Sequence, residues 1–134
     1  MAFLTWSDQY LLGNSTIDSE HRELFKQIST FHDLWKQRQS PEELSKCFAE
    51  LVTFIEIHFR HEEAIMEQAC FPHLEEHRFL HRMMLETVQG LQQSYEKKTY
   101  RLAEDTMRYL KNWLIEHIVE HDHQLREYLP PQQS

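Results

Sequence analysis

Glycine and proline are scarce in this 134-residue sequence, which contains 2 glycines and 4 prolines. Both residues interrupt helices, so their scarcity permits long continuous helices. The β-branched runs that favour strands are also few. The composition therefore predicts an all-α protein. The length suits one domain, residues 1–134, with a single core.

Cysteines and long hydrophobic runs are rare as well. The two cysteines, Cys47 and Cys70, do not make a disulfide framework, and free thiols in a reducing compartment are the simpler interpretation. No apolar run approaches the roughly 20 residues of a membrane span. The N-terminus lacks the basic and apolar regions of a secretory signal. We therefore expect a cytoplasmic protein that does not insert into membranes.

Basic residues are outnumbered, with 14 Lys and Arg against 22 Asp and Glu, a formal net charge of -8. This balance argues against binding to nucleic acid or to an anionic membrane surface. Histidine, in contrast, is abundant: the chain has 10 histidines, and their spacing calls for an explanation.

Four amphipathic segments show the apolar spacing of helices. Asp18 is expected to cap the first helix, and Ser40 with Glu43 forms a capping box around Pro41 at the start of the second. Short connections between the helices predict an up-down-up-down four-helix bundle. The expected segments are an extended N-terminal arm over residues 1–18 and helices over about 19–38, 41–67, 72–95 and 100–126.

Candidate metal ligands recur at helical spacing. His58 with Glu62, and His77 with His81, are pairs four residues apart, so each pair lies on one face of a helix. In an up-down-up-down bundle the start of the first helix and the end of the last helix share an end with these pairs. That end adds three further candidates: His21, His117 and Asp122.

A cluster of five histidines and two carboxylates over two helical levels suits two metal ions better than one. A buried carboxylate without a partner costs several kcal/mol, and metal binding removes that cost. Two choices remain open from spacing alone. His73 lies on the same stripe as His77, and His121 shares a face with His117, whereas Asp122 requires a local distortion of the last helix.

The order and spacing of these residues along the chain resemble those of the hemerythrins, specifically the single-domain bacterial type. The resemblance covers nearly the whole chain. It rests on four motifs: Trp6…Gly13-Asn14…Ile17-Asp18-Ser19-Glu20-His21, His58-Phe59-x2-Glu62-Glu63-x2-Met66, His77-x3-His81, and Trp113-Leu114-x2-His117-Ile118-x3-Asp122. The spacing of the last motif in the family assigns Asp122 rather than His121.

The resemblance implies a non-haem di-iron centre with two Fe ions per chain, which alternate between Fe2+ and Fe3+. It implies that His77, His81 and His117 hold one iron and that His21 and His58 hold the other. Glu62, Asp122 and a solvent-derived oxo or hydroxo group would bridge the two ions. The iron with two histidines is one ligand short, and dioxygen would bind there beside an apolar pocket formed by Phe59, Met66, Trp113 and Leu114.

We therefore expect a protein that binds dioxygen reversibly for transport, storage or delivery, without catalysis, and with an unidentified oxygen-accepting protein as a further partner. Two alternatives follow from the same residues. One is a di-iron oxidase, peroxidase or nitric-oxide-handling enzyme, which would turn over with a reductant. The other is a sensor of O2 or iron, in which occupancy of the site changes a contact with a partner.

Overall fold

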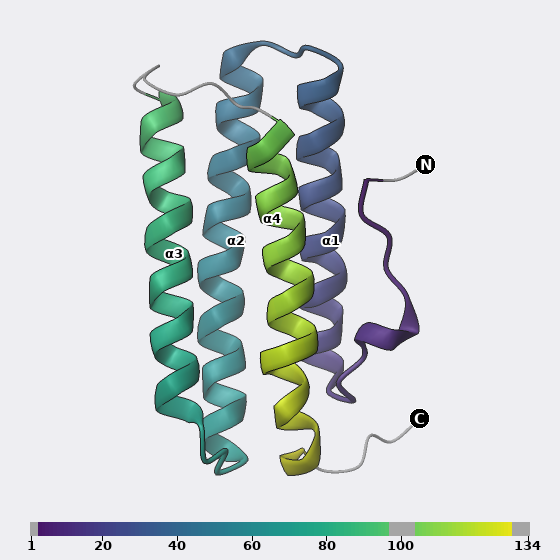
Figure 1. Ribbon diagram of the computed structural model, residues 1–134, viewed down its shortest axis with the longest axis vertical. Helices are drawn as coiled ribbons and strands as arrows, with labels where there is room; N and C mark the ends of the chain where they lie inside the picture. The colour runs from purple at the N-terminus through teal and green to yellow at the C-terminus, as the bar shows by residue number, and fades with distance from the viewer. Residues whose placement is uncertain (1–2, 97–103, 130–134) are drawn as a thin grey trace.

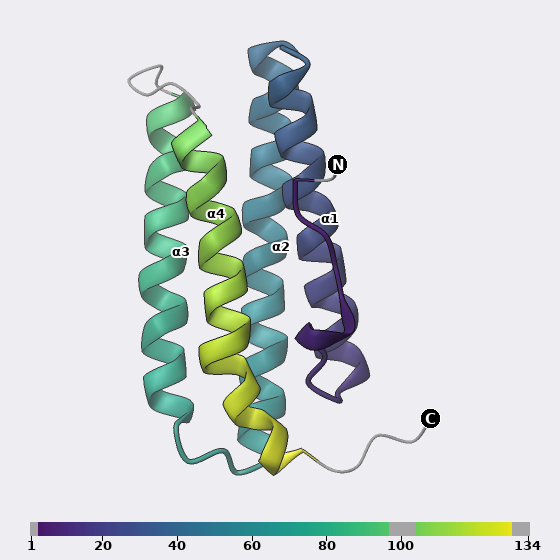
Figure 2. The same cartoon turned by 45° about the vertical axis from the view of Figure 1, so that its right-hand side comes forward.

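Four helices lie side by side along the long axis of the computed structural model (Figures 1 and 2). The structure describes residues 3–96 and 104–129. α2 packs against both α1 and α3, and α1 also packs against α4. The predicted all-α up-down-up-down bundle is confirmed. The helices are α1, Ser15–Lys36; α2, Pro41–Gln68; α3, Leu74–Glu96; and α4, Glu104–Glu116.

The start of α2 forms as the sequence predicts, whereas the start of α1 does not. At α2, Ser40 accepts a hydrogen bond of 3.2 Å from the backbone N–H of Glu43, and Pro41 occupies the first turn. α1 begins at Ser15 instead of residue 19, because Asn14 and not Asp18 is the capping residue. The Asn14 side chain accepts a bond of 3.0 Å from the backbone N–H of Ile17.

Asp18 instead ties the N-terminal arm to α1. Its carboxylate accepts hydrogen bonds from the backbone N–H groups of Leu12, at 2.8 Å, and Gly13, at 3.1 Å. Gly13 has a φ of 99°, a conformation that glycine adopts at little cost. Asp18 therefore lies within the first turns of α1, and its carboxylate accepts from backbone N–H groups of the turn before the helix. The prediction that Asp18 caps the first helix is wrong for this reason.

The other helix ends differ from expectation by varying amounts. α3 begins at Leu74, two residues after the predicted start. Residues 100–103, the predicted beginning of the last helix, lie outside the described residues. The α-helical part of this segment ends at Glu116, and the chain continues through η2, a π-helix over His117–His121, and η3, a 3-10 helix over Asp122–Tyr128. These two segments replace the regular helix expected up to residue 126.

The N-terminal arm packs along α1, as predicted, and contains one short 3-10 helix, η1, Asp8–Tyr10 (Figures 1 and 2). Leu4, Tyr10 and Leu12 of the arm are buried and belong to the main hydrophobic core. The indole ring of Trp6 meets the ring of Phe25 edge to face, with centroids 5.2 Å apart. The arm thus packs along one flank of α1, and its Phe3 also contacts Lys111 of α4.

One end of the bundle collects four helix ends. The start of α1, the end of α2, the start of α3 and the end of the α4–η2–η3 segment all lie at the lower end in Figure 1. This arrangement brings residues far apart in the sequence into one volume. None of the helices in the described part of the chain combines the length and the apolar character that a membrane span requires.

Candidate metal centre

The structure brings all seven predicted metal ligands together at this end of the bundle. Each of these seven residues is at most 3% exposed. They form two overlapping groups whose possible ligand atoms lie within 4.8 Å of one another. One group contains His77, His81 and His117, the other contains His21 and His58, and both contain Glu62 and Asp122.

Glu62 stands between the two histidine groups and offers one carboxylate oxygen to each. Its Oε1 lies 3.0 Å from Nε2 of His77 and 3.1 Å from Nε2 of His81. Its Oε2 lies 3.3 Å from Nε2 of His21 and 3.3 Å from Nε2 of His58. A carboxylate whose two oxygens face different sets of nitrogen donors has the orientation of a bridge between two cations.

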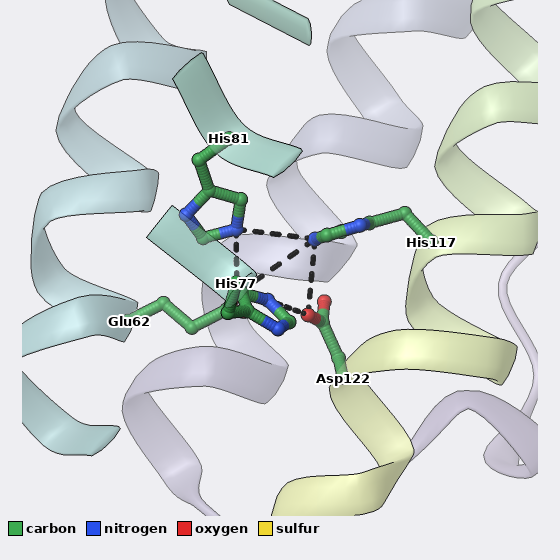
Figure 3. A group of neighbouring side chains, drawn as sticks. All are labelled: Glu62, His77, His81, His117 and Asp122. Carbon is green, nitrogen blue, oxygen red and sulfur yellow. Dashed lines mark hydrogen bonds and ion pairs between the residues drawn. The ribbon is translucent and has the colours of Figure 1, made fainter. Parts of the chain in front are cut away.

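The two carboxylate oxygens of Asp122 likewise lie near different histidine groups. Its Oδ1 lies 2.8 Å from Nε2 of His77 and 3.1 Å from Nε2 of His117 (Figure 3). Its Oδ2 lies 3.1 Å from Nε2 of His21. The two carboxylates therefore share the same two sets of histidines, and the structure favours Asp122 over His121, which belongs to neither group.

The donor atoms fit metal ions better than they fit one another. The Nε2 atoms of His81 and His117 lie 3.1 Å apart (Figure 3), so one ring must donate a proton to the other unless a cation lies between them. Nε2 of His21, Oε2 of Glu62 and both carboxylate oxygens of Asp122 are buried close to one another or to other donor atoms, but none of them makes a hydrogen bond with good geometry. Buried polar atoms are nearly always partnered in proteins, and a bound metal ion would partner all of these.

Spacing between donor atoms supports the same conclusion. Two ligand atoms that are each about 2.1 Å from one ion and about 90° apart are about 3.0 Å from one another. The nitrogen–oxygen distances around Glu62 and Asp122, 2.8–3.3 Å for the closest pairs, match this edge of a coordination polyhedron. Histidine and carboxylate donors together suit iron and similar divalent transition metals.

The π-helix η2 is the local distortion that lets Asp122 reach the site. The backbone N–H of Asp122 donates to the carbonyl of His117, five residues earlier. A π turn brings residues five apart to the same face, and such turns often occur at functional sites. An α turn would instead have placed His121 beside His117. The local distortion that Asp122 requires is therefore present.

The connection between α2 and α3 sets the distance between their ligands. The backbone N–H of Phe71 donates to the carbonyl of Met66 and that of Cys70 donates to Glu67, at 3.0 and 3.1 Å. This is a Schellman motif, with Cys70 at φ 54° in the left-handed position that glycine usually occupies. Phe71 is buried, and its ring lies 6.3 Å from that of His77. The tight turn brings the last turns of α2 directly against the first turns of α3.

Two further carboxylates, which spacing did not single out, hold histidines of the site from outside. The Nδ1–H of His58 donates to Glu20 at 2.8 Å, and that of His81 donates to Glu63 at 2.8 Å. Glu20 also contacts the half-exposed His61. Carboxylates that accept from the second ring nitrogen orient a metal-binding imidazole and raise its basicity. In the sequence, Glu20 and Glu63 were marked by their adjacency to His21 and Glu62 and by their place in the family motifs. Neither signal showed which histidine each one contacts, because the partners lie on other helices.

The electrostatics of the site balance buried negative and positive groups. Burial raises the pKa of Glu62 and of Asp122, but the surrounding histidines outweigh it and keep both pKa values low. Burial lowers the pKa of His58 and of His117, but Glu62 and Asp122 raise these values to about 9 and about 10. Without metal, the cluster therefore holds protons where it would otherwise hold cations.

The predicted pocket residues are all buried, and two of them contact the group of three histidines. The ring of Phe59 stacks on His81, with centroids 3.8 Å apart, and lies 6.0 Å from the ring of His58. Trp113 lies parallel to His117 at 6.1 Å. Met66 is fully buried and Leu114 is 2% exposed. Their role beside bound dioxygen stays a prediction.

Comparison with known protein families shows the family to which this chain belongs. The Hemerythrin HHE cation binding domain matches residues 12–129 of the chain. The chain belongs to the hemerythrin family. The match includes both histidine groups and both shared carboxylates, so the family and the geometry of the site agree.

Hemerythrin relatives align over most of this chain. The bacteriohemerythrin of Methylococcus capsulatus is 24% identical, with 91% of this chain and 93% of the relative covered. The bacteriohemerythrin of Clostridium acetobutylicum is 28% identical, with 92% and 97% covered, and the myohemerythrin of Theromyzon tessulatum is 29% identical, with 84% and 82% covered. A crystal structure of a hemerythrin with a leucine-to-alanine substitution has the same fold, with a TM-score of 0.90, 22% identity and coverage of 96% and 98%.

We expect Glu20→Ala to weaken metal binding at the group of two histidines. His58 would lose the acceptor of its Nδ1–H, and such outer contacts contribute about 10–100-fold to metal affinity. Metal content measured after dialysis against a weak chelator should fall from two ions per chain toward one. Glu56→Ala is the matched control, because that carboxylate pairs with the exposed Arg60. Unchanged affinity in Glu20→Ala would show that Glu20 does not orient His58.

The stability gained from metal should increase with pH. In the metal-free protein, the raised pKa of His58 contributes stability that is complete below about pH 6.5 and is lost as pH rises through about 9. The lowered pKa values of Glu62 and Asp122 contribute the same stability at every pH in this range, because both groups stay ionised. Metal replaces the proton on the imidazole. The Tm difference between metal-loaded and metal-free protein should therefore widen from pH 6.5 to 9, and a constant difference would contradict these pKa directions.

Proposed function

We propose that this protein binds dioxygen reversibly at two iron ions, for oxygen transport, storage or delivery. The observation that carries the proposal is that the two oxygens of each shared carboxylate face different histidine groups. One oxygen of Glu62 and one of Asp122 lie near histidines of the group of three, and the other oxygen of each lies near histidines of the group of two. Such an arrangement accommodates two cations that share two carboxylates. Two ferrous ions held by these residues would supply the electrons that reversible dioxygen binding requires.

The unequal number of histidines supports an open position for dioxygen. His77, His81 and His117 with the two carboxylates and a solvent bridge supply six ligands, the number for an octahedral ion. His21 and His58 with the same carboxylates and bridge supply five. An ion held by this second set would be one ligand short, and a small neutral ligand would bind there without displacing a side chain.

The balance of charges in the site favours reversible binding over oxidation chemistry. Ferritin-like di-iron proteins hold their metals with four carboxylates and two histidines. This site has five histidines and two carboxylates, so the protein supplies two negative charges where those proteins supply four. Anionic ligands stabilise iron in high oxidation states. Fewer of them make cleavage of the bond between the oxygen atoms less favourable.

The test of this function is an optical titration. Protein loaded with iron under anaerobic conditions should contain two Fe per chain and should gain a visible absorption band on addition of one O2 per two Fe. Removal of O2 should abolish the band and restore the starting spectrum over repeated cycles. A single iron per chain would contradict the two-ion site. Irreversible oxidation on first contact, or turnover with an added reductant, would contradict the carrier function.

Leu114 gives a second test, directed at the apolar surroundings of the site. The side chain is 2% exposed and lies one turn before His117. Leu114→Ala should destabilise the fold by about 2–5 kcal/mol, as other changes of this kind do. It should leave iron content unchanged, because no ligand is altered. Water would then reach the site more easily, so the absorption band of the oxygenated protein should decay faster.

Leu51→Ala is the control for this experiment. Leu51 is fully buried in α2, two turns before His58, so its truncation destabilises the core at a distance from the metals. If both variants lose the band equally fast, instability explains the decay and Leu114 is ordinary core. If Leu114→Ala decays no faster than the parent protein, the pocket assignment is wrong.

A further inference from the structure

The buried site raises the question of how metal reaches it. Glu62 and Asp122 are fully buried, and the histidines around them are almost so. Two of the seven side chains nevertheless border surface depressions. His77 lines a groove of about 580 Å³ between the start of α3 and the end of the chain's last helical segment. His117 lines an adjacent cavity of about 270 Å³ between α3 and α4.

The groove beside His77 is lined by side chains that can bind a cation. We call it the α3–η3 groove; its lining is His73, Glu75, Glu76, His77, Phe79, Leu80, His121 and Gln124. Nδ1 of His73 lies 3.6 Å from a carboxylate oxygen of Glu76, and both side chains are exposed. That distance is close to the separation of about 3.0–3.5 Å expected for two ligands of one ion.

His73 is also aligned with the buried site. The backbone N–H of His77 donates to the carbonyl of His73 at 3.0 Å, so His73, the residue just before α3, lies one helical turn from His77. One turn advances about 5.4 Å along the axis. An ion held at the surface by His73 and Glu76 is therefore about one turn from the first buried ligand.

His121 stands where the groove and the adjacent cavity meet, because it lines both. A regular α-helix would place this residue on the face of His117, but η2 brings Asp122 there instead. The His121 ring lies 5.6 Å from that of His117. The π turn that supplies a buried carboxylate thus leaves an imidazole just outside the site.

We propose that the α3–η3 groove is the route by which ferrous iron enters the site, and that His73, Glu76 and His121 bind the ion in transit and pass it to His77 and His117. This inference rests on the proposed iron site. Each step exchanges one nitrogen or oxygen ligand for another, so the ion never crosses the protein without ligands. That matters because an unsolvated charge in a protein interior is costly.

The experiment measures the rate at which metal-free protein takes up Fe2+ under anaerobic conditions, by stopped-flow spectroscopy. The variants are His121→Ala and the double substitution His73→Ala with Glu76→Gln. Both should slow uptake several-fold, while the final content stays at two ions per chain and the Tm of loaded protein is unchanged. The double variant alters only the start of α3 and the residue before it, so it tests the route even if His121→Ala perturbs η2.

Two controls separate the route from general attraction of cations to an acidic protein. Glu50→Gln removes the same single charge as Glu76→Gln, from an exposed carboxylate that lines a depression on α1 and α2 with none of the seven ligands. Glu116→Gln alters the cavity beside His117. The proposal requires Glu50→Gln to load like the parent protein.

If the groove variants take up Fe2+ as fast as the parent protein, the proposal is wrong. Slowing by Glu50→Gln as large as that by the double variant would do the same, and so would slowing confined to Glu116→Gln. Failure of the proposed function looks different. In that case the parent protein itself would not bind two ions, whatever the rate at which it binds them.

Discussion

Two carboxylates buried at one end of a helix bundle are the constraint on which the rest of the structure depends. Glu62 and Asp122 are both fully buried, and a buried carboxylate is costly unless positive charge compensates it. Five imidazoles from four separate segments surround them, and the two oxygens of each carboxylate face different histidines. Metal ions satisfy both kinds of group at once, whereas protons satisfy them only in part and with strongly shifted pKa values.

Departures from regular structure occur where this cluster is assembled. The left-handed Cys70 closes the turn that sets α3 against α2, and the π-helix after α4 turns Asp122 inward. Each departure has a local cost that the packing around the site must offset. Away from the cluster, the described helices are regular and their apolar stripes meet in one core. The connection between α1 and α2 contains another left-handed residue, Arg38, with a φ of 58°. Two of the irregular backbone segments of this chain, the turn at Cys70 and the π-helix η2, thus lie at the end where the donors converge.

Much of this arrangement was predictable because helical periodicity is strong and breakers are few. The pairs His58 with Glu62 and His77 with His81 follow directly from the period of the α-helix. Asp122 did not follow from that period, since a π turn leaves no trace in hydrophobic spacing, and only the resemblance to a family pointed to it. The cap of α1 was predicted at the wrong residue because Asp18 bonds backward to Leu12 and Gly13, a tertiary contact of the arm. Glu20 was not assigned a role because its partner His58 lies on another helix.

The most direct test of the central claim is a crystal structure of the iron-loaded protein, with diffraction data collected at the iron absorption edge. The account predicts two anomalous peaks per chain, one among His77, His81 and His117 and the other beside His21 and His58. Each peak should have one oxygen of Glu62 and one of Asp122 next to it. A single peak between the two histidine groups, or two peaks with either carboxylate bound to one ion alone, would contradict the shared-carboxylate site.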